Sequence, residues 1–248
     1  MTMDRMSAVA VLSANARLGF TLTYLNIFAD LQRFGIDFLP TLSPYWEQAI
    51  CGSIATALQH YGDRRYILFY DGDGAWQSGD IRTLYDAIEA DPSIDAIFPC
   101  QASRGGDVPL AYGYRFNGSR RSMTYADDLQ ECEHGTFAAT FVRMDVFRRM
   151  AEPWLLSIPG ADGSWRGTDK IDSDTYFWKK LDGLNAGTGR RVVQHNKVLV
   201  GHLELMVRWP NGSATACQTL GDWFKTHRPP AGAHCPTMAE MQDQNNPL

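Results

Sequence analysis

Short apolar runs alternate with segments of helical periodicity through the first hundred residues, and this order constrains the fold more than any other feature. Four runs have the length of buried strands: AVAVLS (8–13), IDFLPTLS (36–43), YILFYD (66–71) and DAIFPC (95–100). The segments between them carry apolar residues at three- and four-residue spacing, and they cover 22–35, 45–62 and 80–91. A regular strand–helix alternation predicts a mostly parallel, doubly wound α/β sheet.

The second half of the chain is less regular. Residues 135–150 predict a strand that runs into a short helix, and residues 173–187 predict a helix that ends at glycine. The apolar stretch 190–205 predicts a hairpin or strand pair, and residues 107–119 predict a strand with a turn. Residues 160–169 contain three glycines and predict a mobile loop.

The length suits one large α/β domain, or one domain with a small appendage, and the fraction of charged residues is ordinary for a soluble enzyme. Of the 248 residues, 44% are hydrophobic, and the sequence becomes polar after Trp209 and Pro210. We therefore expect one catalytic domain over residues 1–210 and an irregular C-terminal extension over 211–248. The formal net charge of −5 does not favour nucleic acid or an anionic membrane as a partner.

Cysteine usage and hydropathy predict a reduced, cytoplasmic protein. The five cysteines are scattered and include no CxxC pair. The first residues lack the apolar core of a signal peptide, and no stretch approaches the roughly 20 apolar residues of a membrane span. Basic pairs, each most simply explained as a solvated edge, occur at 64–65, 120–121, 148–149, 179–180 and 190–191.

Two acidic residues follow directly after the apolar run 66–70. They are Asp71 and Asp73, separated by Gly72. In an extended segment residues i and i+2 point the same way, so both carboxylates can reach one cation at the carboxyl end of a strand. Two oxygen ligands suit Mg²⁺ or Mn²⁺, with substrate phosphates completing the shell. The alternative is a solvated Asx turn that closes the strand.

Five segments together resemble the GT-A fold nucleotide-sugar glycosyltransferases, particularly their family 2-like group. In chain order they are YILFYDGDGAW (66–76), SIDAIFPCQASRGGDVP (93–109), EHGTFAATFVRMDVFRRMAEPWL (133–155), DSDTYFWKKLDGLNAG (172–187) and RVVQHNKVLVGHLE (191–204). The first resembles that family's strand and DxD metal motif, and the fourth resembles the helix that carries its catalytic acid. The resemblance implies a GT-A, Rossmann-like sheet flanked by helices and a metal-dependent sugar transfer.

The resemblance also implies a metal site. Asp71 and Asp73 match the ligands that hold the cation and, through it, the diphosphate of the donor, for which a UDP-sugar is favoured. His202 matches the histidine that completes the site in many such enzymes, and an imidazole suits Mn²⁺ better than Mg²⁺. Without the resemblance, a lone histidine after an apolar strand is more simply a structural or surface residue.

Asp174 matches the carboxylate that deprotonates the acceptor hydroxyl as it attacks the anomeric carbon, which implies inversion. Asp172 is the alternative for this role. Helix N-terminal placement also explains both acids, because the macrodipole favours carboxylates there and Asp172 or Ser173 can serve as the cap. The family commonly has Glu where this chain has Ser173, and an ARN triplet where residues 51–53 read CGS.

Further donor or acceptor contacts implied by the resemblance are Ser13, Arg17, Gly72, Gly135 and Trp165. The first two lie at the end of the first strand, near the nucleoside base. The two glycines let the backbone approach the donor, and the tryptophan offers a stacking face for a ring. The acceptor stays open among a glycan, a protein, a small molecule and a modified nucleic-acid base, and so does the oligomeric state.

Other functions stay open beside this one. A nucleotidyltransferase that makes sugar nucleotides uses a related scaffold, but it needs a Gly-rich basic loop, whereas residues 13–19 hold one arginine and one glycine. A non-catalytic nucleotide-sugar-binding module could retain the fold. Cys217, His227, His234 and Cys235 could in principle bind zinc, although their spacing matches no zinc finger.

Overall fold

The structure is a computed structural model that describes residues 5–13, 21–39, 43, 45–77, 79–101, 127–165, 169–203, 206–209 and 216–219. The chain forms two compact units, Met1–His202 and Leu203–Leu248. Residue 210 lies outside the described residues, so the predicted domain boundary there stays a prediction. Within the described part, no helix is both long enough and apolar enough to cross a membrane.

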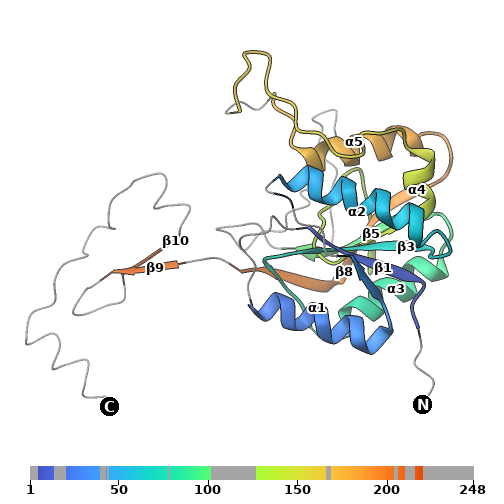
Figure 1. Ribbon diagram of the computed structural model, residues 1–248, viewed down its shortest axis with the longest axis horizontal. Coiled ribbons are helices and arrows are strands. Elements are labelled where there is room, and N and C mark those ends of the chain that lie inside the picture. The colour runs from blue at the N-terminus through green and yellow to red at the C-terminus, as the bar shows by residue number, and fades with distance from the viewer. Residues whose placement is uncertain are drawn as a thin grey trace, which may run out of the picture. The chain divides into compact units, whose positions relative to one another are not determined.

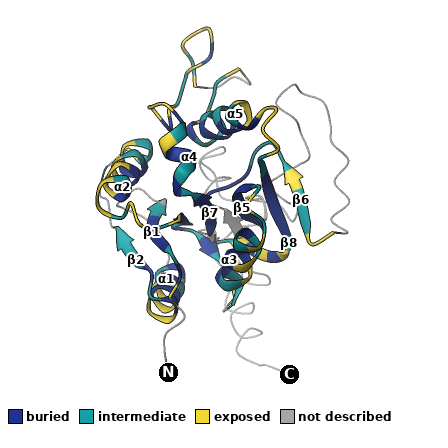
Figure 2. Cartoon of the chain, turned by 90° about the vertical axis from the view of Figure 1, so that its right-hand side faces the viewer, coloured by how far each residue is buried: buried dark blue, intermediate teal, exposed yellow. Residues whose placement is uncertain are grey.

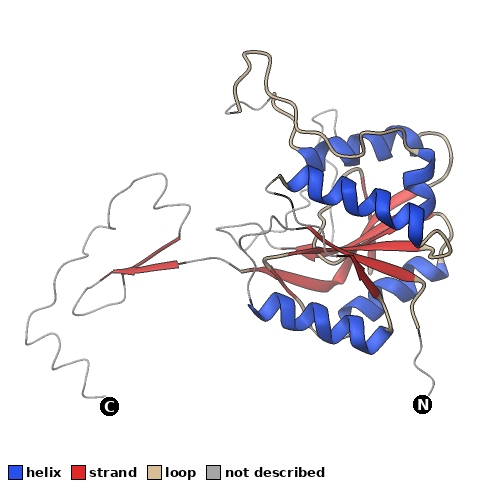
Figure 3. Ribbon diagram, in the orientation of Figure 1, coloured by secondary structure: helices blue, strands red, loops and turns tan. Residues whose placement is uncertain are grey.

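A mixed sheet forms the centre of the first unit (Figures 1 and 3). Its described strands are β1 (Ala8–Ser13), β2 (Asp37–Leu39), β3 (Tyr66–Asp71), β4 (Gly74–Ala75), β5 (Ile94–Gln101), β6 (Leu129–Cys132), β7 (Thr140–Arg143) and β8 (Arg191–His202). They lie in the order β2-β1-β3-β7-β5-β8-β4, with β6 beside β8.

The sheet is partly parallel. Strands β1, β2, β3, β5 and β8 share one direction, because β7 runs antiparallel to both β3 and β5 and so leaves those two parallel to each other. The short strands β4 and β6 run antiparallel to β8. A central multi-strand sheet flanked by helices confirms the predicted α/β class and is consistent with a GT-A-like Rossmann fold.

Helices cover both faces of this sheet (Figures 1 and 2). α1 (Thr21–Phe34) and α3 (Asp80–Ala90) pack on one face, whereas α2 (Trp46–His60), α4 (Met144–Arg149) and α5 (Ser173–Asn185) pack on the other. Strand β3 is buried on both sides: Tyr66, Leu68 and Tyr70 join the first core, and Ile67 and Phe69 join the second. A strand covered on both faces reads as a continuous apolar run, which explains the sequence before Asp71.

The structure corrects the hairpin or strand pair predicted for residues 190–205. One continuous strand, β8, covers Arg191–His202. Its pairing with β5 jumps from His195 to Leu199 between two adjacent β5 residues, so residues 196–198 form a bulge within one strand and not the turn of a hairpin. The backbone N–H of Asn196 in that bulge donates to the Asp128 carbonyl at 2.8 Å. The predicted strand over 107–119 lies outside the described residues.

Acid–arginine pairs gather where the parallel strands begin. Asp95, near the start of β5, is fully buried and pairs with Arg149 at 2.7 Å and with Arg190. Arg191, the first residue of β8, pairs with Asp91 at 2.5 Å. Two of the basic pairs in the sequence, 148–149 and 190–191, therefore hold the beginnings of β5 and β8 and helix α4 in place.

The second unit contributes two described strands, β9 (Met206–Trp209) and β10 (Ala216–Thr219). They pair antiparallel, with Met206 opposite Thr219 and Trp209 opposite Ala216. The predicted irregular tail from residue 220 onwards lies outside the described residues.

Candidate metal centre

The carboxyl ends of the parallel strands meet at one edge of the sheet. Asp71 is the last residue of β3, Gln101 the last of β5 and His202 the last of β8. Ser13 ends β1 and is paired in register with Asp71, so its backbone lies at the same edge. This is the edge at which ligands bind in open α/β sheets.

A two-residue strand brings the histidine to the acidic turn. The chain leaves β3 at Asp71, turns through Gly72 and Asp73, and pairs as β4 with the end of β8. In this pairing Gly74 lies opposite His202, and Ala75 lies opposite Gly201. No local periodicity predicts this strand pairing, since β4 has only two residues, although the resemblance implies that His202 belongs to the same site.

The ligand atoms of Asp71, Asp73 and His202 all lie within 4.8 Å of one another, and each residue is half-buried. Among the described residues, this is the group of histidine, cysteine and acidic side chains arranged so that they could hold a metal ion. Two carboxylate oxygens and one imidazole nitrogen form a donor set that fits Mn²⁺, or Mg²⁺ less well. The three predicted ligands therefore come together with the chemistry that a divalent cation needs.

Three side chains of helix α1 hydrogen-bond to residues 74–76, which directly follow Asp73. The Thr23 hydroxyl donates to the Gly74 carbonyl at 2.8 Å, and the Asn26 amide donates to the Trp76 carbonyl at 3.2 Å. The Trp76 indole N–H donates to the Asp30 carboxylate at 2.8 Å. These three helical residues lie three and four positions apart and so share one face of α1. We call them the α1 clamp.

Asp30 is the titratable member of the α1 clamp. It is 5% exposed, and burial raises the pKa of its carboxyl to about 6, although the hydrogen bond from Trp76 opposes the shift. The Trp76 ring stacks on Tyr70 with centroids 5.1 Å apart. Sequence reasoning missed this arrangement, because an aspartate inside a helical pattern carries no sign of its partner.

Burial separates the two candidate catalytic acids. Asp172 precedes α5 with its side chain 57% exposed, and Lys170 donates to it at 2.8 Å. Asp174, in the first turn of α5, is half-buried and accepts the Thr175 backbone N–H at 2.6 Å. Burial raises the pKa of the Asp174 carboxyl, and the nearby charge of Asp172 adds to this effect. Asp172 occupies the N-cap position without a side-chain capping bond.

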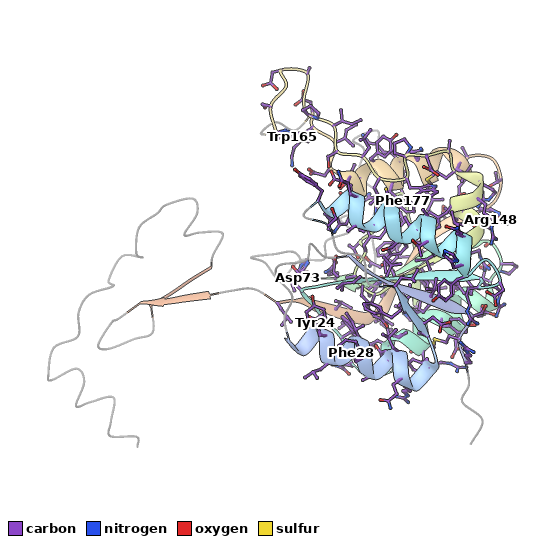
Figure 4. All side chains as sticks on the ribbon, viewed as in Figure 1. Tyr24, Phe28, Asp73, Arg148, Trp165 and Phe177 are labelled. Carbon is purple, nitrogen blue, oxygen red and sulfur yellow. The ribbon has the colours of Figure 1, made fainter. Side chains whose placement is uncertain are left out.

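The other predicted contacts are found in different settings. Gly135 lies against Phe98, where an added Cβ would be 2.6 Å from a ring carbon, so close packing explains the glycine. Trp165 is 54% exposed on a projecting loop, and Figure 4 shows its label well apart from that of Asp73. Arg17 lies outside the described residues. The structure thus brings the three predicted metal ligands together and does not bring Trp165 to them.

The alternative zinc cluster cannot be assembled from described side chains. Cys217 lies on β10, and its three suggested partners lie outside the described residues. The resemblance assigns no role to His134, whose pKa is lowered by burial while the charges of Glu133 and Asp174 oppose that shift. This coupling places an imidazole near the candidate base.

Comparison with known proteins supports the fold. No family model matches the chain, and no curated protein matches it. Among solved structures, A197 from STIV is 14% identical, with a TM-score of 0.51 over 80% of this chain and 86% of that chain. GalNAc-T7, crystallised with UDP, GalNAc and Mn²⁺, is 11% identical, with a TM-score of 0.46 over 79% of this chain and 38% of that chain. The first similarity shows a shared fold and nothing about activity.

Proposed function

We propose that this protein is a divalent-metal-dependent glycosyltransferase that moves a sugar from a nucleotide-sugar to an acceptor hydroxyl. One observation carries the proposal: two carboxylates and an imidazole gather within 4.8 Å at the carboxyl edge of the sheet. The residues that meet there are those that the sequence resemblance assigns to the metal site. A UDP-sugar is the proposed donor, and the cytoplasm is the proposed location.

The chain's own residues divide the work. Asp71, Asp73 and His202 would hold the cation beside the donor diphosphate. When bound, Mn²⁺ or Mg²⁺ supplies positive charge that stabilises the departing nucleoside diphosphate. The α1 clamp fixes the loop that carries Asp73, so that both carboxylates are oriented before substrate arrives.

Asp174 is the proposed general base. Burial raises the pKa of its carboxyl, and a base is most effective when its pKa lies near the operating pH. It would take the proton from the acceptor hydroxyl as that oxygen attacks the anomeric carbon from the side opposite the leaving group, giving inversion. Asp172 fits the role less well because it is exposed and engaged by Lys170.

The decisive experiment is donor hydrolysis by the full-length protein with UDP-, GDP-, CMP- and TDP-sugars, in Mn²⁺ and in EDTA. We expect slow release of one nucleotide that EDTA abolishes, and its loss in Asp71→Asn and Asp73→Asn. Asp86→Asn is the matched control, because Asp86 is an exposed acid on α3 that pairs with Arg82 and does not belong to the candidate metal group. If no donor is turned over and no nucleotide binds in the presence of metal, the proposal is wrong.

The same assay tests the base. In donor hydrolysis water takes the place of the acceptor hydroxyl, so Asp174→Asn should slow nucleotide release by about 10²- to 10⁴-fold, the usual contribution of general base catalysis, and leave Mn²⁺ affinity unchanged. Asp172→Asn should stay close to the wild-type rate. Equal losses in both variants would remove the assignment of the base to Asp174.

A further inference from the structure

A buried glutamine contacts the proposed metal ligand His202. Gln101 ends β5, is 1% exposed, and its amide Nε2 lies 2.8 Å from His202 Nε2. Its Cα partner in the pairing of β5 with β8 is Val200, two residues before the histidine. A buried amide needs a hydrogen-bond partner, and this imidazole is the partner that the structure gives it.

The contact decides which imidazole nitrogen can bind a cation. A neutral imidazole has one protonated nitrogen, which donates, and one unprotonated nitrogen, whose lone pair can bind a cation. If the Gln101 NH₂ group donates to Nε2, the ring proton lies on Nδ1, which then has no lone pair to offer. If the Gln101 amide group is rotated by 180°, so that its oxygen and NH₂ group exchange places, the oxygen accepts from Nε2–H. The other ring nitrogen, Nδ1, is then unprotonated. The amide orientation and the ring tautomer are therefore linked.

We propose that Gln101 is a positioning residue for the metal site: its side-chain carbonyl accepts the Nε2–H of His202 and so presents Nδ1 to the cation. The inference rests on the proposed function, because it needs a metal at Asp71, Asp73 and His202. Metal-binding histidines generally donate their second ring N–H to an oxygen, which fixes the ring and its tautomer. In this chain the β5 strand end supplies that oxygen.

The first test is Mn²⁺ binding to the full-length protein by calorimetry. Gln101→Met keeps the length of the side chain and removes the acceptor, so the dissociation constant should rise by about 10- to 100-fold. Gln101→Glu keeps an acceptor oxygen and should bind Mn²⁺ at least as tightly as the wild type. Wild-type affinity in Gln101→Met would overturn the proposal.

Gln194→Met is the matched control. Gln194 is fully buried on β8, and its amide donates to Asn196 Oδ1 at 2.7 Å, so the substitution makes the same chemical change without touching His202. Its Mn²⁺ affinity should stay at the wild-type value. A loss equal to that of Gln101→Met would show a general effect on the sheet and overturn the proposal.

A double-mutant cycle shows whether Gln101 acts through His202. His202→Ala and the double variant His202→Ala/Gln101→Met should bind Mn²⁺ equally weakly, because the acceptor has nothing left to orient. Additive losses would make Gln101 an independent ligand and overturn the positioning role.

If Asp71→Asn leaves Mn²⁺ affinity unchanged, the metal site of the proposed function fails; if only the Gln101 variants are without effect, this inference alone fails.

Nitrogen-15 NMR of the imidazole gives a readout that needs no variant of Gln101. In the Mg²⁺-saturated protein, the signal that disappears in His202→Ala should report a proton on Nε2 and none on Nδ1. A proton on Nδ1 in that state would contradict the proposal directly.

Discussion

The two ends of the parallel strands carry different arrangements of charge: acids paired with arginines at one end, and two acids close together at the other. At the edge where the parallel strands begin, buried Asp95 lies between Arg149 and Arg190. At the edge where they end, Asp71 and Asp73 lie together with a histidine, all within 4.8 Å. The first arrangement neutralises charge within the protein. The second places two like charges together, which costs free energy unless a cation or another positive group offsets it.

This difference shows how one sheet can hold stabilising ion pairs at one edge and a candidate metal site at the other. Removing a partner from a neutralised buried pair leaves an uncompensated charge and destabilises the fold. Removing the carboxylate of Asp71 or Asp73 should relieve the repulsion between these two side chains and weaken the proposed metal binding. The same substitution, aspartate to asparagine, should therefore have opposite consequences at the two edges.

The largest effect is expected at the beginning of β5. Asp95→Asn leaves Arg149 and Arg190 without their shared buried carboxylate and should lower the free energy of unfolding by about 4 kcal/mol. Denaturant unfolding with EDTA present measures this loss. Asp145→Asn is the matched control, because Asp145 pairs with the same Arg149 but is 50% exposed, and it should cost less than about 1 kcal/mol. Equal losses of stability in Asp95→Asn and Asp145→Asn would show that burial of the carboxylate does not set the size of the effect.

The second effect is expected at the acidic turn. Asp71→Asn and Asp73→Asn should each weaken Mn²⁺ binding by more than about 100-fold, which corresponds to about 3 kcal/mol of binding free energy. The loss should exceed that for a residue such as Gln101, which only orients a ligand. Without metal, each variant should be as stable as the wild type or more stable. Saturating Mn²⁺, at about 100 times its dissociation constant, should stabilise only the wild type, by about 2.7 kcal/mol.

Unfolding with and without Mn²⁺ checks both halves of that expectation. A loss of stability in metal-free Asp71→Asn as large as that of Asp95→Asn would break the comparison. It would mean that the acidic edge also serves the fold through contacts within the protein.

The third effect concerns Asp30 in the α1 clamp. Its pKa of about 6 lies above the ordinary value of 3.8, so the folded protein holds this proton more tightly than the unfolded chain. Stability from this group is therefore complete below about pH 4 and is lost as the pH rises through 6. Asp30→Asn keeps an acceptor for Trp76 and should stabilise the protein by about 2 kcal/mol at pH 7.5.

Denaturant unfolding of Asp30→Asn and the wild type between pH 4 and pH 8 tests the sign. The advantage of the variant should vanish near pH 4 and grow to its full size above pH 6. An advantage that does not change with pH would show that packing, and not ionisation, sets it. Asp86→Asn should show no comparable trend, because Asp86 is an exposed acid on α3.

The sequence predicted the elements that depend on local pattern. The apolar runs became β1, β3 and β5, and the periodic segments became α1, α2, α3 and α5. Asp71 and Asp73 stand out in the sequence because they follow a continuous apolar run, which became β3. The antiparallel insertion of β7 and the pairing of β4 with β8 were not predicted, since both depend on partners far away in the chain and leave no local periodicity.

Side-chain partners were the least predictable part of the site. Local sequence predicts solvated edges for the basic pairs, because the partner Asp95 is 54 residues from Arg149 and 95 from Arg190. Gln101 was missed because a glutamine at a strand end has no motif, and its meaning comes from the histidine 101 positions later. The order of elements follows from local physics, whereas the charge pairing depends on how those elements meet.

The smallest effect is expected from the α1 clamp itself, at Thr23. Thr23→Val keeps the shape of the side chain and removes the buried hydrogen bond to the Gly74 carbonyl, which should cost about 1 kcal/mol of stability. Because Gly74 pairs with His202, the loosened loop should also weaken Mn²⁺ binding, by less than about tenfold. Thr56→Val is the matched control, since the Thr56 hydroxyl donates to the Gly52 carbonyl on the surface of α2. Unchanged Mn²⁺ affinity in Thr23→Val would show that Asp71, Asp73 and His202 keep their geometry without this hydrogen bond from α1.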